Sequence, residues 1–298
     1  MLEVFRILIQ RGFEVEAGIC EEILLRPDRI RAAHDLYVLK SSELSFCVGG
    51  MLHVQGARLL NPYPSCLAVQ NKVVTCWLLR DAGIPTPDSW ATIDLELARS
   101  LVQERPVIIK PYLGNRGTGI SIVRRPDDLD VVPMPKCPVI VQEYVEGGGE
   151  DLKLYVVGEE VFATRRRFGE FSLTGPPCSA SEELRELGRR CGQALGLGLY
   201  GVDVIEGPHG PVVVDVNQFP SYTGIPDVER LIASYIEGYA HGDHTLEPPA
   251  LLGQPTFEQA ADRADLATSP ATLSRALSPL PVANLDQGSR PKAPASTS

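Results

Sequence analysis

Two neighbouring apolar segments of this sequence carry side chains that can ligate a metal ion. The segment 212–220 has the composition of a buried strand and holds Asp215 and Asn217 two residues apart, and the segment 199–205 holds Asp203. Side chains at i and i+2 share one face of a strand, and the Gly/Pro-rich turn between the segments predicts a hairpin. Mg²⁺ prefers carboxylate and amide oxygens, usually completed by substrate phosphates. The pattern therefore indicates a magnesium site beside a nucleotide; a hairpin with solvated polar positions is the alternative.

A glycine-rich loop lies between two further predicted strands, 106–110 and 119–124. Its backbone N–H groups could bind phosphate, or the loop could be a plain hairpin turn. It lacks the Gly-Lys-Ser/Thr ending of a Walker A loop, and no helix follows it directly, as a dinucleotide-binding fingerprint requires. The loop residues that we assign to nucleotide binding are Gly114, Arg116, Gly117 and Gly119.

Two lysines favour the phosphate-binding interpretation of this loop. Lys110 ends the apolar strand that leads into the loop, and Lys72 begins a helical region. Lysine binds phosphate as a point charge. Either lysine alone is more typical of a solvated surface, but a Lys-Pro pair that closes a buried strand beside a glycine loop indicates function.

Polar residues at the end of the next predicted strand, 138–145, complete a candidate nucleotide pocket. The backbone of this segment could hold adenine, and Glu150 could bind the ribose, with Lys153 nearby. A basic run, Arg165–Arg167, could stabilise a developing phosphoryl charge; a solvated basic strand is the alternative. The strand-end residues that we assign to the pocket are Gln142, Glu143, Tyr144 and Val145.

Composition argues against several classes of protein. The 298 residues are 44% hydrophobic, which suffices for one large or two modest cores. The net charge of −10 argues against non-specific nucleic-acid binding. Neither a run of about 18 apolar residues nor a signal-peptide pattern occurs, so we expect a cytoplasmic protein that does not enter a membrane. The seven cysteines form no C-x-x-C pair, and we expect small buried side chains rather than zinc ligands or disulfides.

The remaining pattern predicts an α/β protein that opens with a helix. Apolar residues at helical spacing precede two predicted strands, 12–17 and 34–40. A single helix is expected over 67–82, with Gly83 at its C-terminal cap. Beyond residue 244 the chain is rich in Pro, Ala, Ser and Thr, which is the composition of a disordered segment.

In their order and spacing these motifs resemble the ATP-grasp superfamily over about residues 35–240. Within it the chain is most similar to RimK-like amino-acid ligases and to the related inositol polyphosphate kinases. The resemblance implies an α/β ATP-grasp fold, in which two subdomains close over ATP behind a small α/β N-terminal domain. The motifs that carry it are Lys72, Lys110-Pro, the loop 114–119, Gln142–Val145, Asp203 and Asp215-Val-Asn217.

The resemblance and the composition divide the chain into three parts. We expect an N-terminal domain over 1–65, an ATP-grasp domain over 66–244 and a disordered tail rich in Pro, Ala and Ser over 245–298. The ATP-grasp domain would comprise a small subdomain with the glycine loop, 66–140, and a metal-binding subdomain, 141–244. Proteins of this kind usually begin with a strand, so we expect the N-terminal domain to lack its first strand or to have a misassigned start.

The resemblance also implies roles for single residues. Lys72 and Lys110 would contact the phosphates of ATP, which the glycine loop covers, while Glu143–Val145 line the adenine pocket. The metal ligands Asp203, Asp215 and Asn217 would hold Mg²⁺, which we expect as two ions replaceable by Mn²⁺. Arg166 and Arg167 are candidates for stabilising an acyl phosphate.

The leading functional hypothesis is an ATP-dependent ligase that joins a small-molecule carboxylate to an amine through an acyl phosphate. Ligases more often carry glutamate at the position of Asp215 and arginine at that of Lys153, so an inositol phosphate kinase remains the runner-up. A kinase acceptor would require at least four converging cations among Lys40, Arg116, Lys153 and Arg165–Arg167. A non-catalytic nucleotide-binding module is the third hypothesis, and the similar proteins also suggest a homo-oligomer.

Overall fold

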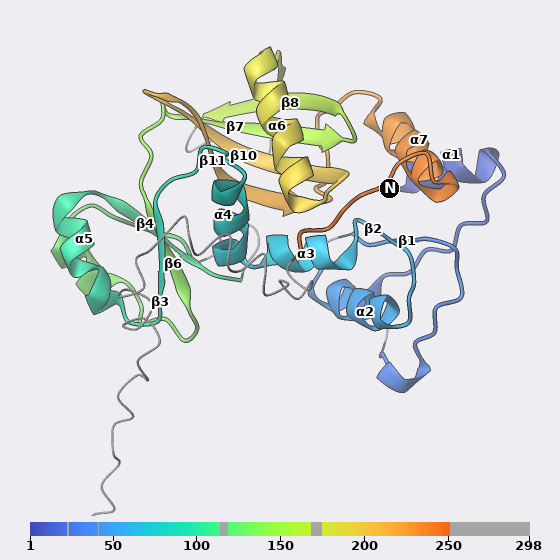
Figure 1. Cartoon of the computed structure of the whole chain (residues 1–298), viewed down its shortest axis with the longest axis horizontal. Coiled ribbons are helices and arrows are strands. Elements are labelled where there is room, and N and C mark those ends of the chain that lie inside the picture. Colours follow the sequence, from blue (N-terminus) through green and yellow to red (C-terminus); the bar gives the residue numbers. More distant parts are fainter. Residues whose placement is uncertain (23, 41, 114–118, 168–174, 251–298) are drawn as a thin grey trace, which may run out of the picture. The chain divides into compact units, whose positions relative to one another are not determined.

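The computed structural model describes residues 1–250 except 23, 41, 114–118 and 168–174 (Figure 1). The expected disordered tail lies outside the described residues beyond position 250, as do Gly114, Arg116 and Gly117 of the glycine loop. The described residues belong to one compact unit, Met1–Leu252.

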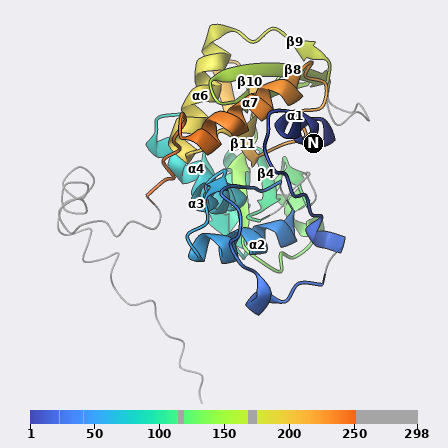
Figure 2. The ribbon, with the colours of Figure 1, turned by 90° about the vertical axis from the view of Figure 1, so that its right-hand side faces the viewer.

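The N-terminal segment packs on the last described helix. Helix α1 (Leu2–Gln10) lies against α7 (Val228–His241), as Figure 2 shows. Its buried side chains, Val4 and Leu8, join an apolar cluster that also contains residues of the central strands. The first helix of the sequence is therefore part of the apolar core.

The strand predicted over residues 12–17 is wrong, because this segment has no regular secondary structure. Its alternating apolar residues, Phe13 and Val15, pack against the cluster around α1 and α7 without pairing to another strand. In the 34–40 segment only β1 (Tyr37–Val38) forms, parallel to β2 (Leu59–Leu60). Helix α2 (Glu43–Val54) connects these strands.

The helix predicted over 67–82 is two helices, α3 (Tyr63–Gln70) and α4 (Lys72–Asp81). Asn71 has an extended backbone, and its side-chain oxygen accepts hydrogen bonds from the N–H groups of Val73 and Val74. Asparagine is among the preferred N-cap residues. The chain therefore starts a new helix at Lys72, and Gly83 follows it with a φ of +66°.

A four-stranded antiparallel sheet forms the smaller layer within the described residues, in the order β3-β6-β4-β5. Helix α5 (Arg99–Glu104) and the 3₁₀ segments η3 (Leu95–Ala98) and η4 (Pro126–Val131) enclose a small apolar core with this sheet. Two further 3₁₀ turns, η1 (Cys20–Glu22) and η2 (Pro27–Arg29), precede it in the chain. The strands are β3 (Ser89–Thr92), β4 (Val107–Pro111), β5 (Ser121–Val123) and β6 (Val139–Glu143).

A five-stranded antiparallel sheet, counted over the described residues, has the order β11-β10-β7-β8-β9. Helix α6 (Glu182–Leu195) lies across one face of it (Figure 1). The predicted hairpin is confirmed, because β10 and β11 pair from Tyr200–Gln218 to Gly207–Gly210. The strands are β7 (Glu150–Val157), β8 (Glu160–Arg167), β9 (Pro177–Cys178), β10 (Leu199–Gly207) and β11 (Gly210–Gln218).

Alternation along these strands gives the sheet one apolar face and one with a polar patch. Leu152 of β7 and Val202 of β10 are buried in the cluster beneath α6. Lys153 and Asp203, the next residues along each strand, therefore point to the opposite face. Asp203 stands directly across from Lys153 on one side and from Asp215 on the other. The fold thus concentrates charge in the middle of one sheet face.

The expectation that the cysteines are buried is only partly right. Cys66 and Cys191 are buried, and burial raises the pKa of each thiol to about 12. Cys47 and Cys137, in contrast, are exposed, and all seven cysteines are free thiols. Among the described helices, none is long and apolar enough to cross a membrane.

Candidate active site

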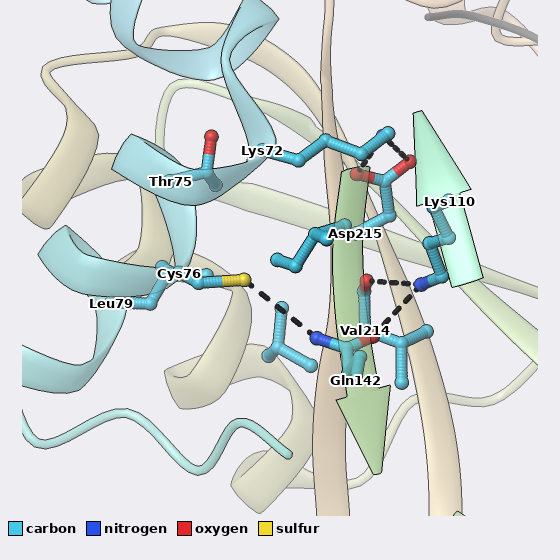
Figure 3. A pocket seen from close by; sticks show the side chains of 10 residues that line it. Lys72, Thr75, Cys76, Leu79, Lys110, Gln142, Val214 and Asp215 are labelled. Carbon is cyan, nitrogen blue, oxygen red and sulfur yellow. Dashed lines mark hydrogen bonds and ion pairs between the residues drawn. The ribbon is translucent and has the colours of Figure 1, made fainter. Parts of the chain in front are cut away.

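Four residues that the sequence assigned to nucleotide and metal binding line one pocket. They come from three separate parts of the fold: Lys72 from α4, Lys110 and Gln142 from β4 and β6, and Asp215 from β11. Figure 3 shows Lys72 directed at Asp215, and Lys110 directed at Gln142 and the backbone of Val214. The small sheet, the large sheet and α4 therefore each supply a charged group to the same site.

The position of Lys72 follows from the break between the two helices. Its backbone N–H donates to the carbonyl of Tyr112 at 2.9 Å, and Asn71 forms a β-bridge with Leu113. The start of α4 is thereby tied to the chain that leads into the glycine loop. The Lys72 ammonium reaches both carboxylate oxygens of Asp215, at 2.6 and 2.7 Å.

Asn71→Ala is expected to lower the free energy of unfolding by about 1 kcal/mol, the typical cost of losing an N-cap. It should also raise the KM for ATP, because the first turn of α4 positions Lys72. Urea unfolding and steady-state kinetics measure the two effects. Ser181→Ala, which removes the side-chain cap of α6, is the matched control: similar destabilisation with an unchanged KM is expected. If both variants leave KM unchanged, the cap has no role in placing Lys72.

Lys110 is a buried cation with neutral hydrogen-bond partners. It is 8% exposed, and its ammonium donates to Gln142 Oε1 at 2.9 Å and to the carbonyl of Val214 at 3.2 Å. Burial lowers the pKa of Lys110, with the Asp215 carboxylate acting in the opposite direction. A charge held in this way by two neutral acceptors is suited to an anionic ligand.

The carbonyl of Val214 is available because β11 contains a bulge. Asp203 is paired with Asp215, but Val204 is paired with Val213, so Val214 is the extra residue. A bulge leaves one residue outside the regular pairing and often redirects groups next to an active site. Here it allows a backbone oxygen of the large sheet to contact Lys110 of the small sheet.

The three predicted metal ligands lie together on the polar face. Asp203 and Asp215 are cross-strand partners, and the amide nitrogen of Asn217 donates to Asp203 Oδ2 at 3.1 Å. This orientation leaves the Asn217 carbonyl oxygen as the atom able to face a cation. Two carboxylates and one amide oxygen are suitable ligands for Mg²⁺, so the residues fit the metal that the sequence predicted. The part of the chain that the structure describes contains no group of three His, Cys, Asp or Glu side chains that could hold a metal, so the candidate site depends on the Asn217 amide as its third ligand.

Lys153 extends this group along the sheet. Its ammonium lies 2.8 Å from Asp203 Oδ1. Although burial disfavours the charge, the Asp203 carboxylate and its hydrogen bond raise the pKa of Lys153 overall. The nitrogen also lies 5.9 Å from the centroid of the Tyr155 ring. Lys153 is therefore held as a cation beside the candidate metal ligands.

Several groups of the segment predicted to bind adenine, residues 142–145, make hydrogen bonds within the chain. Gln142 is almost fully buried, and it bonds Lys110 and the hydroxyl of Ser89. The N–H groups of Glu143 and Tyr144 donate to carbonyls of the chain's own backbone, those of Asp88 and Pro106. Gln142 therefore positions Lys110. The N–H groups of Glu143 and Tyr144 already donate hydrogen bonds within the chain, so they are not available to a ligand. Contact between this segment and adenine therefore stays a prediction.

The predicted arginines and Glu150 lie on different faces of β7 and β8. Arg166 pairs with Asp151, on the face that carries Lys153. Arg165 pairs with Glu150 at 3.2 Å and with Glu206 at 2.5 Å, and alternation places it on the opposite face. The structure therefore places Arg166 on the face that carries the candidate metal ligands and does not bring Glu150 there. The side chain of Arg167 lies outside the described residues.

Gly119 closes the described part of the glycine loop. Its φ is +74°, and a Cβ at this position would lie 3.0 Å from Pro111. Both features favour glycine. The predicted unit of two strands around a loop is confirmed, with Ile109 of β4 paired to Ser121 of β5.

Sequence reasoning missed several residues of the site. Thr75 and Cys76, one turn after Lys72, line the pocket, and Cys76 Sγ accepts from Gln142 at 3.7 Å. Their helical spacing from Lys72 was a usable signal once Lys72 was chosen. Asp151, the partner of Arg166, could have been found from the strand period, since it stands two residues before Lys153.

Comparisons with known proteins show the family to which the chain belongs. Residues 69–236 match the model of the RimK-like ATP-grasp domain. A probable alpha-L-glutamate ligase of Stutzerimonas stutzeri (strain A1501) is 31% identical over 206 residues, which cover 62% of this chain and 68% of the relative.

Solved structures show the same fold. A RimK domain protein of Sphaerobacter thermophilus DSM 20745 superposes with a TM-score of 0.67 at 19% identity, covering 78% of this chain and 94% of that one. The ATP-grasp ligase PsnB, solved with a minimal precursor, Mg and ADP, gives a TM-score of 0.60 at 21% identity, covering 79% and 93%. The chain belongs to the RimK-like ATP-grasp family, whose members use ATP and magnesium, and it is an ATP-dependent carboxylate–amine ligase.

Proposed function

We propose that the pocket between α4, the small sheet and β11 binds the triphosphate of ATP, with Lys72 and Lys110 as its phosphate ligands. The convergence of both lysines with Asp215 in one pocket carries this proposal. Asp203, Asp215 and Asn217 would hold two Mg²⁺ ions, and Mn²⁺ would serve in their place because it accepts the same oxygen ligands. The glycine loop would cover the phosphates.

The chemistry of this site is phosphoryl transfer followed by acyl transfer. An oxygen of the substrate carboxylate attacks the γ-phosphorus of ATP, the bond to the β–γ bridging oxygen breaks, and ADP leaves. The amine nitrogen then attacks the acyl carbon, the bond to the phosphate oxygen breaks, and inorganic phosphate leaves as the nitrogen loses a proton. When bound, magnesium neutralises charge on the triphosphate.

The chain's own groups bind and orient these reactants. Lys110 and Lys72 hold the phosphates, and Arg166, on the same sheet face as Lys153, is placed to stabilise the acyl phosphate. Fixed cations in a partly buried site stabilise developing negative charge without reorganising. This requires no side-chain nucleophile.

The proposed substrates are an amino-acid carboxylate and a small or peptidic amine. The relative from Stutzerimonas stutzeri is named a probable alpha-L-glutamate ligase, and PsnB was solved with a minimal precursor; these two names support an amino acid and a peptide as the substrate classes to test. The homo-oligomer and the cytoplasmic location expected from the sequence stay predictions.

The geometry does not favour the kinase alternative. Among the described cations, Lys40 donates to the carbonyl of Pro220 and lies over the Phe219 ring. Arg165 is paired on the opposite face of the sheet. The convergence of four cations that a polyphosphate acceptor would need is therefore not met by the side chains that the structure describes.

ATP turnover with Mg²⁺ tests the proposed substrates. Amino acids and small carboxylates are supplied in pairs with amines, and the products are identified by mass. We expect ADP, phosphate and an amide in equal amounts. A phosphorylated inositol from a parallel panel, with no amide, would contradict the proposal.

A further inference from the structure

Each oxygen of the two candidate metal carboxylates already accepts a hydrogen bond from the chain's own donors. Both oxygens of Asp215 accept from Lys72, at 2.6 and 2.7 Å. Of the oxygens of Asp203, Oδ1 accepts from Lys153 at 2.8 Å and Oδ2 from Asn217 at 3.1 Å. All four carboxylate oxygens are therefore engaged, three of the four contacts being made by ammonium groups.

These ion pairs are partly shielded from water. The side chains of Lys72 and Asp215 are 14% and 25% exposed, and those of Lys153 and Asp203 are 27% and 35% exposed. Ion pairs in partly buried positions are screened less than surface pairs. A divalent cation that approaches Asp215 therefore competes with the Lys72 ammonium for the carboxylate and is repelled by its charge.

The two pocket lysines differ in what holds them. Lys110 donates hydrogen bonds to two neutral acceptors, Gln142 Oε1 and the Val214 carbonyl. It can attract a phosphate without giving up an ion pair. Lys72 is instead bound to Asp215, yet it lines the same pocket. Phosphate that arrives at Lys110 thus places negative charge within reach of Lys72.

We propose that Lys72, supported by Lys153, is an internal counter-ion that closes the metal site until a nucleotide draws it away from Asp215, so that metal and nucleotide bind as a coupled pair. This inference rests on the proposed assignment of Asp203, Asp215 and Asn217 as metal ligands. Its consequence is that nucleotide-free protein binds the metal weakly. Coupling is reciprocal, so the metal raises nucleotide affinity by the same factor, typically about 5- to 150-fold.

Binding of Mn²⁺ to the full chain, followed by the electron paramagnetic resonance signal of free Mn²⁺, tests this inference without any turnover. In the absence of nucleotide, Lys72→Met is expected to bind Mn²⁺ at least about 10-fold more tightly than the wild type, within the usual range of coupling factors. Saturating ADP should tighten Mn²⁺ binding to the wild type and have a smaller effect on the variant. Lys72→Gln provides a second substitution, and thermal unfolding checks that each variant is folded.

Two control variants separate release of the carboxylate from a general loss of positive charge. Lys110→Met removes a cation from the same pocket without uncovering a carboxylate oxygen, and Lys136→Met removes an exposed cation. Neither should tighten nucleotide-free Mn²⁺ binding as Lys72→Met does. Equal tightening in Lys110→Met would overturn the counter-ion role of Lys72.

The remaining outcomes distinguish this inference from the proposed function. If the wild type binds Mn²⁺ equally well with and without ADP, and Asp215→Asn abolishes that binding, the metal assignment stands and the counter-ion inference is wrong. If Asp215→Asn binds Mn²⁺ as the wild type does under both conditions, the metal assignment itself is wrong, and the inference falls with it.

Discussion

Asp215→Asn is expected to lower kcat/KM for ATP-dependent amide formation by about 10³-fold, corresponding to about 4 kcal/mol of transition-state stabilisation. Asparagine keeps the shape of the side chain but removes the charge that balances a divalent cation. Asp215 also lies in the pocket with both lysines, so its loss affects the phosphoryl-transfer step directly. Steady-state kinetics with Mg²⁺ measure the effect.

The same substitution should leave metal-free nucleotide binding intact. Because Lys72 loses its ion pair with Asp215, its ammonium becomes free to contact phosphate, and ADP should bind in EDTA at least as tightly as to the wild type. A catalytic defect without a binding defect distinguishes a metal ligand from a residue that only supports the fold. Calorimetric titration of ADP supplies this second measurement.

Asp215→Glu is the conservative control. The longer side chain still provides a carboxylate, and ligases that the chain resembles more often carry glutamate at this position, so this variant should keep much of its activity. Asp130→Asn, which removes an exposed partner of Arg99, should have no effect on kcat/KM. Retention of full activity in Asp215→Asn would show that Asp215 holds no essential metal.

The hairpin that carries the proposed metal ligands could be predicted from the sequence, because its strand pattern and its turn are both local features. Alternation fixes which side chains share a face, and the short turn fixes which strand is the partner. Asp203 and Asp215 therefore had to lie near each other once both strands were recognised, and they are cross-strand partners. The pairs with Lys72 and Lys153 required the packing of α4 and the position of β7, which no local pattern gives.

Gln142 shows where local reasoning was insufficient. Its place at the end of a strand suggested contact with adenine, but β6 lies between β3 and β4. A side chain on a central strand reaches its neighbours on both sides, and Gln142 accordingly contacts Ser89 of β3 and Lys110 of β4. Strand order within a sheet depends on contacts distant in sequence, so this role could not be read from the residues alone.

The other errors have separate physical causes. The predicted helix over 67–82 breaks because Asn71 caps a new helix, and this preference was present in the sequence. The predicted strand over 12–17 does not form, because the side chains of Phe13 and Val15 pack against helices instead of lying in a sheet. An alternating pattern reports which side chains are buried but does not guarantee a partner strand.

Lys110→Met is expected to weaken ADP binding by about 10²-fold, since a hydrogen bond to a charged group contributes about 1.5–3 kcal/mol and this lysine is buried against the pocket. Methionine resembles the apolar stem of lysine, so the loss should come from the ammonium itself. Calorimetric titration of ADP measures it, with Lys136→Met as the control that keeps wild-type affinity. Wild-type affinity in Lys110→Met would remove Lys110 from the phosphate site.

The stability of Lys110→Met should also depend on pH in a characteristic way. Burial lowers the pKa of Lys110 below its ordinary value of 10.5. Between the folded-state pKa and 10.5, the unfolded chain therefore binds more protons at this residue than the folded chain does. The free energy of unfolding of the wild type rises with pH in that window relative to the variant. In urea unfolding, the free energy of unfolding of the wild type should increase relative to that of Lys110→Met as pH approaches 10.5. The free energy of unfolding of Lys136→Met should change with pH as that of the wild type does. A difference between wild type and Lys110→Met that stays constant with pH would contradict a buried, destabilising ammonium at this position.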